Sequence, residues 1–233
     1  MVENLRNNMT EEGIGMNRLK RINVLLVTIG ILFLATQMSA CKDATEIDPG
    51  ILGKNTYSNE FFGFEITLPD DWYLLDQQGM NAVSQAGGRA VAGKNKRLKA
   101  AVKAAKNGSH NLVMAYEHPV GTRVPFNPAI GAVAQRLDML PGVRSGRDYL
   151  LYLKRFMSQS RIRVDFSPEI GLVKVGGVYF DHVYAEANLG NTMVSQEYYA
   201  SVRKGYVLSF LMSYVEGDQY GVLQKSIDSI VFH

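Results

Sequence analysis

The chain has 233 residues, 46% of them hydrophobic and 20% charged, and a formal net charge of +3. This length suits one domain with a sizeable core, and the composition is that of a folded protein rather than a disordered one. The near-neutral charge argues against a dedicated nucleic-acid binder, which needs a strongly basic surface, and a single cysteine rules out an internal disulfide.

Residues 1–40 have the layout of a secretory signal. A basic leader precedes the mostly apolar run Val24–Ala35, and small residues follow that run. The run is shorter than the roughly 20 apolar residues that a membrane-spanning helix needs. We therefore expect residues 1–40 to be a signal peptide whose functional start is Met16, with residues 1–15 as the product of an upstream start codon that is not the one used.

The stretch Met38-Ser39-Ala40-Cys41 resembles the lipobox of bacterial lipoproteins, which ends in two small residues and a cysteine. The resemblance implies cleavage between Ala40 and Cys41, a diacylglycerol on the Cys41 thiol and an acyl chain on the new amine. Two or more chains anchor a protein stably, whereas one does so only marginally. The alternative is a buried free cysteine in a cleaved or uncleaved anchor.

An aspartate directly after the cysteine often marks retention in the inner membrane of bacteria, and this chain has Lys42 there. We therefore expect a lipid-anchored protein in the cell membrane or outer membrane, facing the periplasm or the exterior. The polar residues 41–55 are predicted to be a tether, and residues 56–233 a single domain.

The domain is expected to open with a short strand at Thr56-Tyr57 and a turn through Ser58-Asn59-Glu60. A second strand, residues 61–68, is predicted from the period-two alternation of four apolar side chains, and Pro69 ends it. Trp72 is expected in the core. The alternating apolar positions are Phe62, Phe64, Ile66 and Leu68.

The centre of the chain alternates helical and strand patterns. Residues 77–107 look helical with a break near Gly87-Gly88, and Ser145 with Asp148 resembles the cap of a helix that extends to Phe156. Strands are predicted at residues 111–117, 129–137 and 169–177.

The C-terminal third predicts an antiparallel meander. Three long strands, residues 178–188, 193–203 and 206–214, are joined by two tight turns, and a helix over 217–229 follows. The last strand is apolar on both faces, so both faces should be covered. The fold class expected is α+β, with a central antiparallel sheet flanked by helices.

The two ends of the domain resemble the PsbP-like (Mog/PsbP/DcrB-type) fold. That resemblance implies an α/β/α sandwich with binding or assembly roles and no catalysis. The matching positions are Gly63-Phe64, Leu68-Pro69, Trp72, Gly205-Tyr206, Phe210, Leu223, Ser229-Ile230 and Phe232.

A basic stripe is the one candidate binding surface. Lys96, Lys99, Lys103 and Lys106 recur three or four apart on one side of a predicted helix. Such a helix can contact an anionic membrane or an acidic partner. The simpler interpretation is a helix that packs on its apolar side and leaves the lysines in water.

No catalytic or metal motif is recognisable. The four histidines, His110, His118, His182 and His233, lack metal-ligand spacing, and Asp70-Asp71 is predicted to be a turn. A glycine-rich stretch over residues 88–95 is similar to a phosphate loop, but Asn95 stands where Ser or Thr would bind Mg²⁺, so no nucleotide is expected.

The sequence thus favours a lipid-anchored accessory or binding protein of the cell envelope, without catalysis, that engages another envelope protein or a small ligand. It predicts no cofactor beyond the acyl groups on Cys41. Two alternatives stay open. One is an envelope hydrolase or isomerase with a dispersed site, and the other is an interfacial protein whose lysine helix contacts anionic lipid.

Overall fold

The computed structural model describes residues 47–233, which form one compact unit. The signal, Cys41 and residues 42–46 of the predicted tether lie outside the described residues. Within residues 47–233, no helix is both long and apolar enough to span a bilayer.

An eight-stranded sheet, antiparallel at every pairing, forms the centre of the domain. Its strand order is β4-β5-β6-β11-β10-β9-β7, and β8 also pairs with β9. Its strands are β4 Tyr73–Leu74, β5 Ser109–Tyr116, β6 Ala129–Arg136, β7 Arg163–Phe166, β8 Gly171–Val175, β9 Val178–Asn188, β10 Met193–Arg203 and β11 Tyr206–Tyr214.

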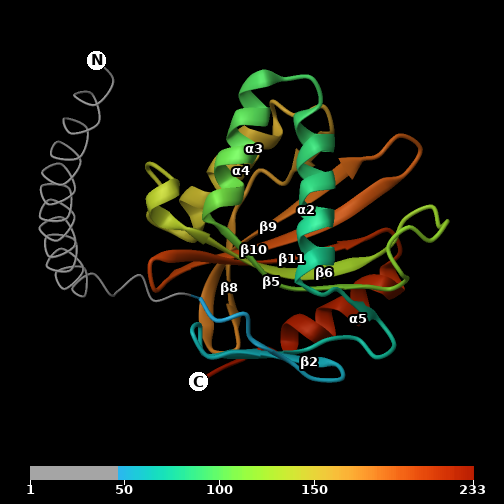
Figure 1. Cartoon of the computed structure of the whole chain (residues 1–233), viewed down its shortest axis with the longest axis vertical. Coiled ribbons are helices and arrows are strands. Elements are labelled where there is room, and N and C mark those ends of the chain that lie inside the picture. The colour runs from blue at the N-terminus through green and yellow to red at the C-terminus, as the bar shows by residue number, and fades with distance from the viewer. Residues whose placement is uncertain (1–46) are drawn as a thin grey trace, which may run out of the picture. The chain divides into compact units, whose positions relative to one another are not determined.

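Helices cover one face of this sheet, and a small second sheet with one helix covers the other (Figure 1). The helices of the first face are α2 Gln77–Ala92, α3 Lys96–Gly108 and α4 Gly146–Met157, with the 3₁₀ turn η1 Leu137–Met139. The other face has α5 Gly217–Asp228 and a sheet in the order β1 Ile51–Leu52, β2 Thr56–Asn59, β3 Phe64–Thr67 and β12 Val231–Phe232.

The two faces of the large sheet have separate cores. On the α5 side, Phe64 from the small sheet, Phe210 from β11 and Leu223 from α5 belong to one buried cluster. On the α4 side, a smaller cluster contains Leu150 and Val207. The expected α+β class with a helix-flanked antiparallel sheet is therefore confirmed, and both faces of β11 are covered as predicted.

The predicted meander is present. Strand β10 pairs antiparallel with β9 and with β11, and the turn between β10 and β11 is the two-residue Lys204-Gly205. Both turn residues have positive φ, 49° and 82°, which is the geometry that matches the twist of paired strands.

The start of the domain differs from the sequence prediction in its boundaries. Strand β2 continues through Ser58 and Asn59, and the turn falls at Glu60–Gly63, so β3 begins at Phe64 rather than at Phe61. The reason is that Gly63 adopts φ 65° and closes the turn. The alternating side chains are nevertheless all buried, and Trp72 is half-buried against the core.

The described part of the predicted tether is folded. Ile47 is buried in the main core, and the Asp48 carboxylate accepts hydrogen bonds from the Phe61 and Gly50 amides, at 2.8 and 2.7 Å. Residues 51–52 form β1, which pairs with β2. Residues 47–55 are thus part of the domain, because long-range contacts hold them there. Their polar composition alone does not indicate such contacts.

Candidate functional site

Two antiparallel helices, α2 and α3, form a hairpin over the sheet. The helical segment does not break near Gly87-Gly88 as predicted; both glycines lie inside α2, and the break falls at Gly93, which has φ 51°. The Asn95 side chain then caps α3 by accepting hydrogen bonds from the Arg97 and Leu98 amides, at 3.0 and 3.2 Å.

This hairpin is strongly cationic. Residues 77–108 contain seven Lys or Arg residues and no Asp or Glu. In α3, Lys99 and Lys103 are four apart and Lys103 and Lys106 three apart, which are like-charge spacings that cost an isolated helix about 0.2–0.5 kcal/mol each. Helix α3 contains no acidic residue to offset this repulsion.

A cavity of about 840 Å³ separates the hairpin from the sheet. Its lining includes the buried residues Leu150 of α4 and Ala92 of α2, together with Leu211 of β11. The volume lies within the range of small-molecule sites, roughly 300–1,000 Å³.

Small side chains leave this space open. The helices present Gly88, Val102 and Ala105 to it, and strand β6 presents Gly131 and Val133. Helix α2 buries only Met80 and Ala92, and α3 buries only Leu98 and Gly108. The hairpin therefore covers the sheet without filling the volume beneath it, unlike the close-packed core on the other face.

The charges of the cavity lie at its rim. Its lining contains four exposed basic side chains, Arg89, Lys99, Lys103 and Lys106, and no carboxylate. Among residues 47–233, none of these four forms an ion pair. Deeper polar groups bond to the protein itself: the Tyr198 hydroxyl donates to Gln196 Oε1 at 2.9 Å, and Ser209 Oγ donates to the Val133 carbonyl at 3.2 Å.

A second, smaller cavity of about 530 Å³ lies on the other side of α3. Arg97 and Leu98 of α3 line it, together with Tyr152 and Phe156 of α4 and the loop after η1. Phe156 lines both cavities, so α3 has open space on two sides.

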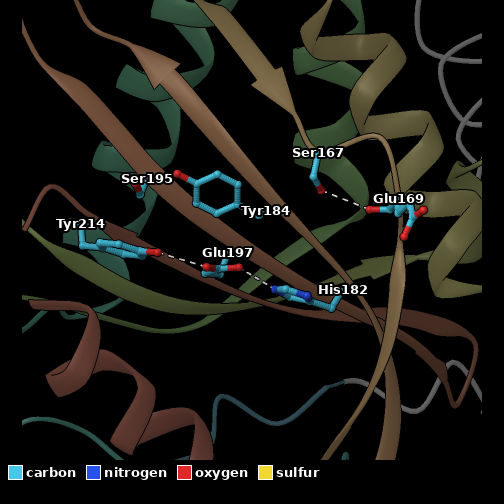
Figure 2. Close-up of polar contacts among 7 residues, drawn as sticks. All are labelled: Ser167, Glu169, His182, Tyr184, Ser195, Glu197 and Tyr214. Carbon is cyan, nitrogen blue, oxygen red and sulfur yellow. Dashed lines mark hydrogen bonds and ion pairs between the residues drawn. The ribbon is translucent and has the colours of Figure 1, made fainter. Parts of the chain in front are cut away.

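A polar cluster crosses three strands on the opposite face of the sheet. Figure 2 shows Glu197 of β10 between His182 of β9 and Tyr214 of β11. The His182 Nε2–H donates to Glu197 Oε2 at 2.6 Å, and the Tyr214 hydroxyl donates to Oε1 at 3.1 Å. Burial raises the pKa of Tyr214, and the Glu197 carboxylate raises it further.

The cluster is a satisfied network rather than a reactive centre. Both Glu197 oxygens have donors, and the His182 ring lies 4.6 Å from that of Tyr199. The neighbouring Ser195 hydroxyl bonds to Tyr184 at 3.0 Å, so it is not positioned as a nucleophile for His182. Neither cavity described above is lined by His182. His182 and Tyr214 thus supply hydrogen bonds to the buried Glu197 carboxylate. Without such partners, burying this charge would lower the stability of the fold.

The residues predicted from the sequence as sites do not all lie at the cavity. Cys41 and Ala40 lie outside the described residues, and of the four lysines of the stripe, Lys99, Lys103 and Lys106 line the large cavity whereas Lys96 does not. Asp70 and Asp71 form a turn, as predicted. Within residues 47–233, no three His, Cys, Asp or Glu side chains gather as a metal site.

Sequence reasoning missed the cavity and the role of Glu197. Period-two strands and amphipathic helices indicate which face is covered, but not how far apart the layers stand. Two signals were available: the absence of acids from residues 77–108, and the small residues of AIGAVAQR over 129–136.

Comparison with protein-family models gives no match, and comparison with curated proteins gives none either. The fold is similar to several solved structures. Cyanobacterial PsbP (CyanoP) from Synechocystis sp. PCC 6803 is 11% identical, with a TM-score of 0.46; the alignment covers 83% of this chain and 99% of that one.

Two further structures are similar at comparable distance. LpqN, involved in cell envelope biogenesis of Mycobacterium tuberculosis, is 14% identical with a TM-score of 0.39, over 79% of this chain and 85% of that one. A protein from Bacteroides thetaiotaomicron VPI-5482 is 13% identical with a TM-score of 0.36, over 73% of this chain and 45% of that one. These are similarities of fold alone.

Proposed function

We propose that this chain is a lipid-anchored lipoprotein of the cell envelope whose domain binds a small, largely apolar ligand between the α2–α3 hairpin and the sheet. The cavity of about 840 Å³ carries the proposal, because a folded domain rarely leaves so much apolar-lined space between its layers unless something occupies it. Binding rather than catalysis is proposed, since the cavity lining contains no His, Cys, Asp or Glu.

The anchor completes the proposal. Cleavage after Ala40 and acylation of Cys41 would fix the chain to the cell membrane or outer membrane. Because Ile47 is already part of the folded core, the tether would consist of residues 42–46 and reach about 18 Å at most. The domain would then lie close to the bilayer, where ligands with an apolar part are concentrated.

The anchor is tested by globomycin, which blocks removal of lipoprotein signals. Treated cells should accumulate a slower-migrating precursor, and mass spectrometry of the untreated chain should find acylated Cys41 at its new N-terminus. An unmodified cysteine in an uncut chain would refute the anchor while leaving ligand binding untouched.

Ligand binding is tested with the full chain, purified in digitonin, which has no alkyl chain to compete. Photoactivatable hexadecanol should label peptides of the cavity lining, and unlabelled hexadecanol should compete. Val133→Phe and, independently, Ala105→Phe should narrow the space and weaken labelling, while far-ultraviolet circular dichroism confirms that each variant is folded. Undiminished labelling in both folded variants would show that the cavity is not the site.

A further inference from the structure

We infer that the ligand of this cavity is a single-chain anionic amphiphile of the fatty-acid class, with its alkyl chain in the cavity and its carboxylate among Lys99, Lys103 and Lys106. This inference deepens the proposed function and rests on it. It specifies the charge of the ligand and the residues that contact the charged group, neither of which follows from the cavity alone.

Charge and apolar surface are separated within this cavity. The exposed rim has four cationic side chains and no carboxylate, whereas the depth is lined by apolar residues such as Leu150, Val133 and Leu211. A ligand that fits both parts has a negative group at one end and an apolar body.

Two of the deeper polar groups already have partners within the protein. Tyr198 donates to Gln196, and Ser209 donates to the Val133 carbonyl. A ligand with polar groups along its whole length would find few free partners in the depth of the cavity and would lose its own hydration there. An alkyl chain has no such cost.

The three lysines of the rim are closely spaced along α3. Lys99, Lys103 and Lys106 lie on one side of α3 and extend over about 10 Å of helix, so their ammonium groups repel one another. An anion between them would relieve that repulsion, and ligand binding should therefore stabilise α3 as well as occupy the cavity. Lys96, which is on the same helix but outside the lining, offers an internal comparison.

The lysines could instead contact an anionic membrane surface, as the sequence pattern allows. The structure favours the cavity ligand because three of the four lysines line the cavity itself. The two cases make different predictions, since membrane contact does not depend on the space beneath the helix.

The experiment is a competition assay against photoactivatable hexadecanol on the full chain in digitonin. Three competitors share a sixteen-carbon chain and differ in the head: palmitate, hexadecanol and hexadecylamine. Palmitate should compete best and hexadecylamine worst. The advantage of palmitate over hexadecanol should be about fivefold or more at low salt, and should shrink as salt screens the charges.

The matched variants are Lys99→Gln/Lys103→Gln/Lys106→Gln, which removes the rim charges, and Lys54→Gln/Lys94→Gln/Lys96→Gln, which removes three charges outside the lining. The first should abolish the advantage of palmitate and leave hexadecanol within about twofold of the wild type. The second should leave the order of competitors unchanged. 1-Palmitoyl lysophosphatidate, as a fourth competitor, distinguishes a phosphate head from a carboxylate.

The outcomes separate the two proposals. If cavity peptides are labelled but the three heads compete equally, the cavity binds apolar ligands and the inference is wrong. If the rim variant leaves the palmitate advantage intact, the lysines do not bind the carboxylate of the ligand. Contact of the lysines with an anionic membrane then becomes the better explanation. If nothing labels the cavity, the proposed function itself fails.

Discussion

Gly88 of α2 lies directly against Val102 of α3. A Cβ atom on Gly88 would lie 2.6 Å from Val102 Cγ1, too close for an undisturbed contact, so the absence of a side chain sets the distance between the two helices. Gly87, one residue earlier in the same helix, has no atom within 4 Å of the corresponding position.

This difference predicts that the same substitution has different effects at the two glycines. Gly87→Ala should stabilise the protein by about 0.5–1 kcal/mol through helix propensity. Gly88→Ala should show no such gain, or a loss, because Val102 must move. In a Val102→Ala background the gain at Gly88 should return. Urea unfolding of the single and double variants measures this coupling, and additive effects would show that the two helices do not touch there.

The cap of α3 should contribute measurably to the hairpin. Asn95→Ala removes the acceptor for the Arg97 and Leu98 amides, and we expect a loss of about 1 kcal/mol. The loss should fall on α3 selectively, as faster amide exchange over residues 96–108. Asn95→Ser keeps an acceptor and should cost much less; equal losses for both variants would mean that the cap is not the cause.

The buried carboxylate of Glu197 should matter for stability. Glu197→Ala leaves the donors of His182 and Tyr214 unpaired on the sheet, with an expected cost of about 3 kcal/mol in the free energy of unfolding. Glu186→Ala is the control, because that exposed carboxylate receives only the Tyr184 hydroxyl and should cost less than about 1 kcal/mol. Similar losses at the two positions would contradict the assigned network.

Alkaline pH should destabilise the domain through its buried tyrosines. Burial raises the pKa of Tyr57 from 10.0 to about 12, so above pH 10 the folded state keeps a proton that the unfolded state has released. The stability contributed by this group is complete below pH 10 and is lost as the pH rises toward 12. Burial raises the pKa of Tyr198, Tyr199 and Tyr214 as well, which adds to the same trend.

The measurement is urea unfolding at a series of pH values from about 8 to about 11.5. Tyr57→Phe should make the alkaline loss of stability less steep. The exposed Tyr73 provides the comparison, since Tyr73→Phe should leave the slope unchanged. A wild-type stability that stays constant across this range would contradict the burial of these phenols.

Local chemistry made parts of the fold predictable. The hairpin through Lys204-Gly205 and the cap at Ser145, whose hydroxyl accepts from the Asp148 amide at 3.1 Å, both depend on residues a few positions apart. By contrast, β7 was not predicted, although Ile162, Val164 and Phe166 alternate with polar residues there. This strand forms by pairing with β9, about twenty residues further along the chain, and the pattern of neighbouring residues does not show that pairing.

By itself, the sequence determined the α+β class, the meander and the cationic character of residues 77–108, because alternation, turn residues and charge are properties of neighbouring positions. Only the tertiary structure decided that the helical segment bends at Gly93, that Glu197 joins His182 to Tyr214, and that a cavity opens beneath three lysines. Those features depend on how segments far apart in the sequence pack together; residues 88, 131 and 211, for example, line the one cavity.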